Sequence, residues 1–269
     1  MARQAVAAGR PGCVAAAFSR AVYLRFTHVK AIMAITTLDV PSGPLHMRVP
    51  TLPEAAVGDA VTVERDTLAV GAHRVLIPTD EWHPPAISHL LERRHVAANV
   101  LRQALGETRL LTLAGIPSDV GGVLSQEGLR ATLSHLAGRG SGLTPAGDDC
   151  AGGILLVTAL LRRAGLATWP SSALVELASD HASHEIAVAF LVAAARGEGI
   201  EPIHTLLDSC ARDDRRAVAR DLRVLDGIGH TSGRDTAYGI LVGLELADVI
   251  AGDWRGVRDR LSSASHSAT

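Results

Sequence analysis

The sequence is short of lysine, of cysteine and of long apolar runs, and each shortage excludes a class of protein. Lys30 is the single lysine, the formal net charge is −2, and no basic stripe is interleaved with aromatic residues, so nucleic acid is not expected as a partner. The three cysteines, Cys13, Cys150 and Cys210, include no C-x-x-C pair. This spacing argues against a disulfide framework and against a zinc site built from cysteine.

No segment of the chain predicts a membrane anchor or a secretion signal. The longest apolar run, residues 186–195, is well short of the roughly 20 residues that span a bilayer. The first residues are rich in alanine but are interrupted by Arg10, Arg20 and Arg25, so they lack the unbroken apolar core of a signal peptide. Together with the unpaired cysteines, these features predict a cytoplasmic protein that has no membrane partner.

The N-terminal third has the composition of a β-structure. From Gly12 to about Pro78, short runs of β-branched residues alternate with proline and glycine turns. The predicted strands cover 20–27, 31–37, 45–49, 60–63 and 74–77. Within 45–49, apolar residues alternate with His46 and Arg48, which is the period of a half-buried strand. Many short strands joined by turns predict a small antiparallel barrel or sandwich.

The pattern becomes helical after the Pro84-Pro85 pair. Apolar residues recur at steps of three and four over 87–105, which predicts an amphipathic helix. Further helices are predicted over 125–137, 148–164, 171–195, 203–225 and 235–250. We therefore expect an α+β protein with a β-rich N-terminal domain at 1–85 and an all-helical C-terminal domain at 86–269. With 47% hydrophobic and 20% charged residues, the chain can bury a substantial core.

Two polar features lie on the predicted helices. Charges of both signs run through 212–216 and continue to Arg220 and Asp221, which predicts a solvated helix face. His181 and His184 are three residues apart, so they could hold a metal ion or contact an active site, although no H-E-x-x-H pattern accompanies them.

A Gly-rich segment occurs twice and is the most informative feature of the chain. Residues 147–155 align without gaps on residues 233–241, with the shared pattern G-x-D-x-A-x-G-I-L. Each copy follows a polar loop and begins an apolar run of helical character. Helix starts carry unsatisfied N–H groups that accommodate anions, metals or capping side chains. The repeat therefore predicts two helix N-termini that face one site.

The first of these loops has the composition of a ligand-binding turn. It reads G-R-G-S-G-L-T-P-A-G-D-D over residues 138–149, and its glycines permit positive φ angles and close approach of the backbone to a ligand. Because no lysine follows, it is not a Walker A phosphate loop.

This run, together with G-H-T-S-G-R-D at 229–235, resembles the signature of the AllH-like family, which includes a subunit of oxamate carbamoyltransferase. A fainter similarity at 18–24 and in the β-rich region that follows extends the resemblance over most of the chain. The resemblance implies a part in splitting N-carbamoyl oxamate (oxalurate) with phosphate into oxamate and carbamoyl phosphate, late in purine-ureide breakdown. It also implies other subunits as partners and a small anionic substrate.

Phosphorolysis of a carbamoyl group requires an anion cradle, donors for the developing oxyanion and a cation for the oxamate carboxylate. Backbone amides of the two loops could supply the first two, Arg139 or Arg234 could bind the carboxylate, and His230 could act as donor or general acid. No organic or redox cofactor is needed. The predicted catalytic residues are His230, Arg234, Asp149 and Asp235, and the predicted substrate-binding residues are Arg139, Gly140, Ser141, Gly142, Thr144, Gly147, Asp148, Thr231, Ser232 and Gly233.

Three acids complicate this interpretation, because Asp148, Asp149 and Asp235 place negative charge where the anion would lie. They could cap the helices, bind a cation such as Mg²⁺ that bridges to phosphate, or accept hydrogen bonds from a substrate NH₂. The sequence leaves these three roles open.

Three neighbouring small residues have simpler interpretations. Gly153 and Gly239 lie one turn into each helix and are expected to let the helices pack closely, while Cys150 is expected to be a buried residue whose pKa the adjacent acids raise.

Two other functions stay open for the whole chain. It could be a non-catalytic scaffold or small-anion-binding subunit, or a stand-alone binding domain for a phosphorylated or acyl-CoA-like ligand, which would require a deeper apolar cleft.

Overall fold

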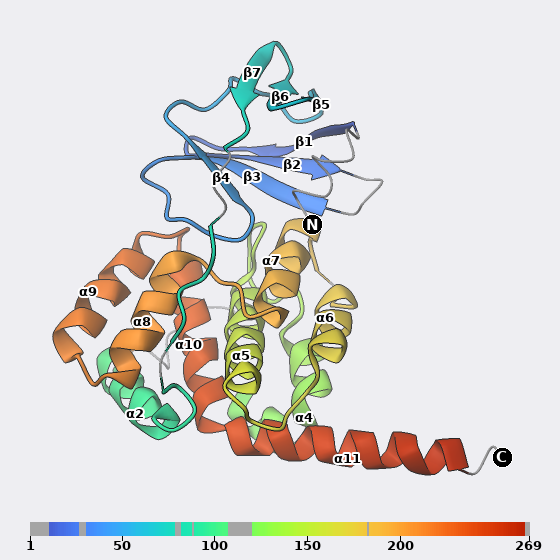
Figure 1. The fold of residues 1–269 in the computed structure, drawn as a ribbon, viewed down its shortest axis with the longest axis vertical. Coiled ribbons are helices and arrows are strands. Elements are labelled where there is room, and N and C mark those ends of the chain that lie inside the picture. Colours follow the sequence, from blue (N-terminus) through green and yellow to red (C-terminus); the bar gives the residue numbers. More distant parts are fainter. Residues whose placement is uncertain are drawn as a thin grey trace. The chain divides into compact units, whose positions relative to one another are not determined.

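The computed structural model describes residues 11–26, 31–78, 82–87, 89–106, 120–181 and 183–266. The chain separates into two compact units, Met1–Pro84 and Pro85–Thr269 (Figure 1). The start of the chain, for which no secretion signal is predicted, lies largely outside the described residues, as does Thr27 at the end of one predicted strand. Within the described helices, none is long and apolar enough to cross a membrane.

The first unit contains one curled, mixed sheet that forms a half-barrel. Its seven described strands lie side by side in the order β4-β3-β2-β1-β5-β6-β7. The strands are β1 (Gly12–Ala17), β2 (Ala21–Phe26), β3 (Ala31–Thr37), β4 (His46–Val49), β5 (Ala60–Glu64), β6 (Thr67–Val70) and β7 (His73–Leu76). The predicted fold class, a β-rich part followed by a helical part, is confirmed.

One strand pair departs from the antiparallel pattern. β3 and β4 are parallel, with Ala34 opposite His46 and Thr37 opposite Val49. Because β4 begins level with Ala34, the connection has to return the chain by only about 10 Å along β3, at roughly 3.3 Å per residue. A short loop achieves this without a crossover helix.

The strands fit together because their side chains alternate between core and surface. In β2, Val22, Leu24 and Phe26 are buried and the residues between them are half-buried. In β4, Met47 and Val49 are buried, as the alternation in the sequence predicts. These side chains belong to a core cluster of the sheet that contains no residue of the helical unit.

The second unit is helical, and nine helices fall within its described residues. They are α2 (Arg94–Leu105), α4 (Val120–Leu136), α5 (Ala146–Arg163), α6 (Ser171–Ser179), α7 (Glu185–Ala195), α8 (Glu201–Ala211), α9 (Arg215–Asp226), α10 (Ser232–Glu245) and α11 (Ala247–His266). α5 packs against α4, α6, α7 and α10 (Figure 1). It is buried on almost all sides, as a helix with apolar residues around most of its circumference must be.

Three predicted helices are each divided in two, since single residues interrupt a continuous apolar pattern. The segment 171–195 breaks before α7, where the Nδ1 atom of His184 accepts a hydrogen bond from the backbone N–H of Ile186 at 3.2 Å. The segment 203–225 breaks after α8. The segment 235–250 breaks after Glu245, where α10 ends.

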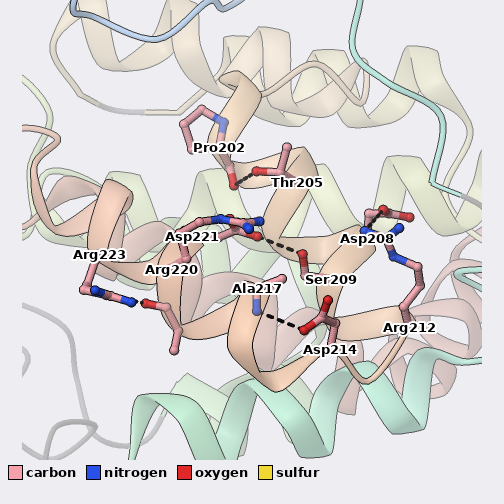
Figure 2. A network of polar contacts seen from close by, with 11 residues as sticks. Pro202, Thr205, Asp208, Ser209, Arg212, Asp214, Ala217, Arg220, Asp221 and Arg223 are labelled. Carbon is pink, nitrogen blue, oxygen red and sulfur yellow. Dashed lines mark hydrogen bonds and ion pairs between the residues drawn. The ribbon is translucent and has the colours of Figure 1, made fainter.

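The break after α8 lies inside the run of mixed charge (Figure 2). Asp213 has a φ of +58°, which ends helical geometry, and the side chain of Asp214 then caps α9 by accepting from the backbone N–H of Ala217 at 3.0 Å. The run 212–216 is exposed, as predicted. Asp221 is not: it is 4% exposed and accepts a hydrogen bond from Ser209 at 2.8 Å, so this part of the prediction is wrong.

Candidate functional site

The two copies of the repeated segment form the first halves of α5 and α10, which cross in direct backbone contact. A Cβ atom on Gly153 would lie 2.3 Å from the carbonyl oxygen of Thr236, and one on Gly239 would lie 2.0 Å from that of Cys150. Cys150 and Thr236 occupy the same position in the two copies, so the contact is reciprocal, as about a local two-fold axis. The prediction that both glycines serve close helix packing is confirmed.

A second pair of glycines repeats this relationship at the helix starts. A Cβ on Gly147 would lie 2.1 Å from the carbonyl oxygen of Leu136, the last residue of α4. A Cβ on Gly233 would lie 2.2 Å from the carbonyl oxygen of Leu225, near the end of α9. Each helix therefore begins pressed against the end of another. This packing accounts for both glycines without a ligand.

The two predicted loops meet at the starts of α5 and α10. The hydroxyl oxygens of Thr144 and Ser232 are 3.2 Å apart, so the predicted proximity of the two helix N-termini is confirmed. Gly140 and Gly142, with φ values of +110° and +95°, adopt conformations that side-chain-bearing residues rarely take. Both glycines and Ser141 between them are exposed, so the tip of this loop is open to solvent.

Hydrogen bonds to the buried carboxylate of Asp148 anchor the first loop. Its carboxylate accepts hydrogen bonds from the backbone N–H of Gly138 and from Nε2 of His181, both at 2.8 Å, and from the hydroxyl of Ser183. Burial alone would raise the pKa of Asp148, but the hydrogen bonds from His181, Ser183 and Gly138 outweigh it and lower that pKa. Asp148 is thus a fully partnered structural anion, and Ser183 is a partner that the sequence did not predict.

Asp149 and Asp235, which occupy matching positions of the repeat, have the opposite environment. Asp235 is 1% exposed, and neither of its carboxyl oxygens has a hydrogen bond of good geometry among the described residues, although the side chain of Thr231 lies near enough to favour its charged form. The Oδ2 atom of Asp149 is likewise buried and unpartnered. The N-cap residues of α5 and α10 are Pro145 and Thr231, and no side chain caps either helix. These two acids are therefore not helix caps.

The protonation of the two acids follows from this burial. Burial raises the pKa of Asp149 well above its usual value, the hydroxyl of Ser232 opposes that rise, and the charge of Asp235 adds to it. Burial also raises the pKa of Asp235, against the opposing effects of Thr231 and Arg234. Because the charge of Asp235 raises the pKa of Asp149, ionisation of one of these carboxyls disfavours ionisation of the other.

The two predicted arginines bond to groups other than Asp149 and Asp235. Arg234 donates from Nε and Nη2 to Oδ1 of Asp226, the last residue of α9, at 3.1 and 2.5 Å. Arg139, in the loop after α4, donates from Nε to the carbonyl oxygen of His135 in the last turn of that helix, at 2.5 Å, and its side chain lies at an exposed position.

Arg234 instead lines an open hollow of about 260 Å³ beside the end of α9, together with Leu225, Asp226, His230 and Thr231. Three of the four predicted catalytic residues lie at the start of α10 and divide between two of its faces, while Asp149 lies on α5. Arg234 and the preceding His230 face the hollow, whereas Asp235, like Ser232, lies toward α5.

The remaining candidates are structural. Cys150 is fully buried, and burial, with the charges of Asp235 and Asp149, raises the pKa of its thiol, so the prediction of an inert buried residue is confirmed. His181 is held by Asp148 and His184 caps α7. In the part of the chain that the structure describes, no three or more histidine, cysteine or acidic residues cluster as metal ligands.

The region that carries this geometry matches a known family. Residues 136–244 match the family model described as oxamate carbamoyltransferase subunit AllH. The match extends from the last residue of α4 almost to the end of α10, so it contains both loops and all three acids. The resemblance seen in the two loops is confirmed over these residues, while the fainter similarity at 18–24 lies outside them. No solved structure matches this chain.

Proposed function

We propose, from the family match over residues 136–244, that this chain is a subunit of an oxamate carbamoyltransferase-like assembly in purine-ureide breakdown. The observation that carries the proposal is the meeting of two helix starts at Thr144 and Ser232 within the matched region. Two converging helix N-termini offer N–H groups and short hydroxyls to a small polar ligand. The partners we propose are the other subunits of the assembly and a small anionic substrate.

The proposed reaction is the phosphorolysis of oxalurate. A phosphate oxygen attacks the terminal carbamoyl carbon, the bond from this carbon to the internal nitrogen breaks, and a proton is delivered to that nitrogen. The products are carbamoyl phosphate and oxamate. Such a transfer depends on positioning and on stabilising charge in the transition state, and it needs no organic or redox cofactor.

We assign the anion-binding part of this reaction to the hollow and the exposed loop. Asp226 accepts from the Nε and Nη2 groups of Arg234. This ion pair orients the guanidinium, and we propose that the Nη1 group of Arg234 binds a carboxylate or phosphate oxygen. His230 lines the same hollow and is the proposed proton donor. The open backbone at Gly140 and Gly142 is the proposed cradle for the second anion.

Arginine and histidine variants in the assembled complex test this proposal. We expect Arg234→Ala and His230→Ala each to lower phosphate-dependent oxalurate cleavage by about 100-fold, within the range for loss of a charge-stabilising group, while the subunit stays folded. Arg212→Ala is the matched control, since Arg212 is an exposed arginine on the distant α8–α9 turn. Unchanged turnover in both site variants would exclude these residues from the mechanism and favour a scaffold or anion-binding subunit.

The location that we propose is the cytoplasm, because the three cysteines are all free thiols in the structure. Treatment of intact cells with a membrane-impermeant thiol reagent tests this location. The partly exposed thiol of Cys13 is expected to stay unlabelled until the cells are opened.

A further inference from the structure

We propose that the unpartnered carboxyl oxygens of Asp149 and Asp235 bind an uncharged carbamoyl or primary amide group, and that the anionic end of the same ligand lies at the Arg234 hollow. This inference rests on the proposed function, since it names the part of the substrate that each face of α10 receives. Arg234 and Asp235 are consecutive residues in the first turn of α10, so both faces belong to the same helix start.

Buried acceptors that lack donors lie at both helix starts. Both carboxyl oxygens of Asp235 and Oδ2 of Asp149 are buried without a hydrogen bond. Buried polar atoms in folded proteins are nearly always partnered, so three orphaned oxygens on two facing helix starts indicate a ligand that supplies N–H or O–H donors. Single buried atoms without a partner occur elsewhere among the described residues, at Thr36, Thr168 and Trp169, but the other two buried acids both have donors. Asp148, one residue away, has three donors, and the buried Asp221 accepts from both Ser209 and Arg220.

The charge of the two acids favours a neutral ligand group. A phosphate or carboxylate between two acids would be repelled, whereas a primary amide is neutral and carries two N–H donors and one carbonyl acceptor. A carboxyl pair that holds one proton presents the complementary set, an ionised acceptor and an O–H donor. Burial favours this state because it raises the pKa of both groups.

A pair of hydroxyl groups lies beside the two acids. Thr144 and Ser232 bring one hydroxyl from each helix start to within 3.2 Å of each other, and the Ser232 hydroxyl also acts on Asp149. Hydroxyls can donate to the amide carbonyl and orient the carboxyl beside it. These groups could also bind a cation, but two helix N-termini directed at one place disfavour positive charge, and among the described residues no third acidic, histidine or cysteine ligand joins them.

Three small ligands of similar size test the inference on the full chain. Oxamate carries a carboxylate and a primary amide, pyruvate replaces the NH₂ group by methyl, and oxalate replaces it by a charged oxygen. We expect oxamate to bind at least about tenfold tighter than either analogue in calorimetry, because a site built to bond an N–H rejects ligands that lack it. Equal binding of oxamate and pyruvate, or no binding of oxamate, would overturn the inference, as would a site that Mg²⁺ occupies in place of oxamate.

Substitutions at the two acids test whether they bind the amide group of oxamate. Asp149→Asn and Asp235→Asn are expected to weaken oxamate binding by about tenfold or more and to reduce the discrimination against oxalate, since each removes an ionisable acceptor. Asp180→Asn, at an exposed acid that ends α6, is the control and should leave both unchanged. If either site variant fails to fold, the three-ligand comparison on the natural protein still decides.

Oxalurate turnover by the assembled complex separates this inference from the proposed function. A complex that cleaves oxalurate while the chain does not distinguish oxamate from pyruvate retains the function and overturns the amide subsite. A complex that does not cleave oxalurate, although the chain binds oxamate through both acids, retains the subsite and overturns the reaction.

Discussion

At the scale of the residue, three acids at two neighbouring helix starts have different roles because their surroundings differ. Asp148 is ionised and bonded to Gly138, His181 and Ser183, whereas Asp235 and Oδ2 of the half-buried Asp149 are buried with unpartnered oxygens. Of the three roles that the sequence left open, capping is excluded for the latter two. Their position in a doublet and a repeat could be read from the sequence, but their burial depends on how α5 and α10 cross.

The raised pKa values of Asp149 and Asp235 predict how stability varies with pH. Between the usual aspartate pKa and the raised values, the folded protein binds more protons than the unfolded chain, so stability falls as pH rises through this window. We expect Asp235→Asn to flatten this slope and to raise the free energy of unfolding at pH 8 by about 1 kcal/mol. Urea unfolding at several pH values measures the slope and the free energy of unfolding. A slope that the substitution leaves unchanged would contradict the raised pKa of Asp235.

For Asp148 the sign is reversed. Its pKa is lowered in the folded state, so its contribution is present above the usual aspartate pKa and is lost as pH falls through the lowered value. We expect Asp148→Ala to cost about 3 kcal/mol, because it removes a buried charge and leaves three donors unpaired. Asp208→Ala, at a partly exposed acid on α8, should cost less than about 1 kcal/mol in the same unfolding measurement.

At the scale of the element, the crossing of α5 and α10 fixes the geometry of the site. The two helices touch backbone to backbone at Gly153 and Gly239, and this contact brings the two helix starts together. The sequence contained this information as the repeated G-x-D-x-A-x-G-I-L pattern. The reciprocity of the contacts explains why both copies keep the same glycine.

A glycine series tests the crossing. Gly153→Ala should destabilise the protein by about 3 kcal/mol or more, because its Cβ would collide with backbone atoms that cannot move independently. Gly152→Ala is the matched control in the same helix: its Cβ would meet nothing closer than 3.7 Å, so the better helix propensity of alanine should leave stability unchanged or raise it by up to about 1 kcal/mol. Equal losses in thermal unfolding would argue against the crossing.

Apolar periodicity predicted which segments are helical, but it did not predict three breaks between helices. A cap at His184 or Asp214 is a single side chain on a face that periodicity leaves unspecified, so 171–195 and 203–225 each read as one helix. For the same reason Ser183 was not predicted as a partner of Asp148, since it lies in one of these breaks. The ion pair of Arg234 with Asp226 joins residues eight positions apart, across a turn whose geometry the sequence pattern does not define.

At the scale of the whole molecule, the sheet and the helices have separate cores. All residues of the candidate site, and all of the family match, lie in the helical unit. We propose that each unit folds on its own, as the shift of composition at Pro84-Pro85 predicts. Residues 85–269 expressed alone should unfold in one cooperative thermal transition. A fragment that is helical but melts without a transition would mean that its core requires the sheet.

The central claim, that the two repeated helix starts form one ligand site, is tested most directly by a double-mutant cycle for oxamate binding between Asp149→Asn and Asp235→Asn. If both acids hold the same amide group, each single substitution removes most of the affinity and the double variant is weakened by much less than the product of the two losses. Losses that simply multiply, or a loss at one position alone, would show that the two acids do not share a ligand and would contradict the account.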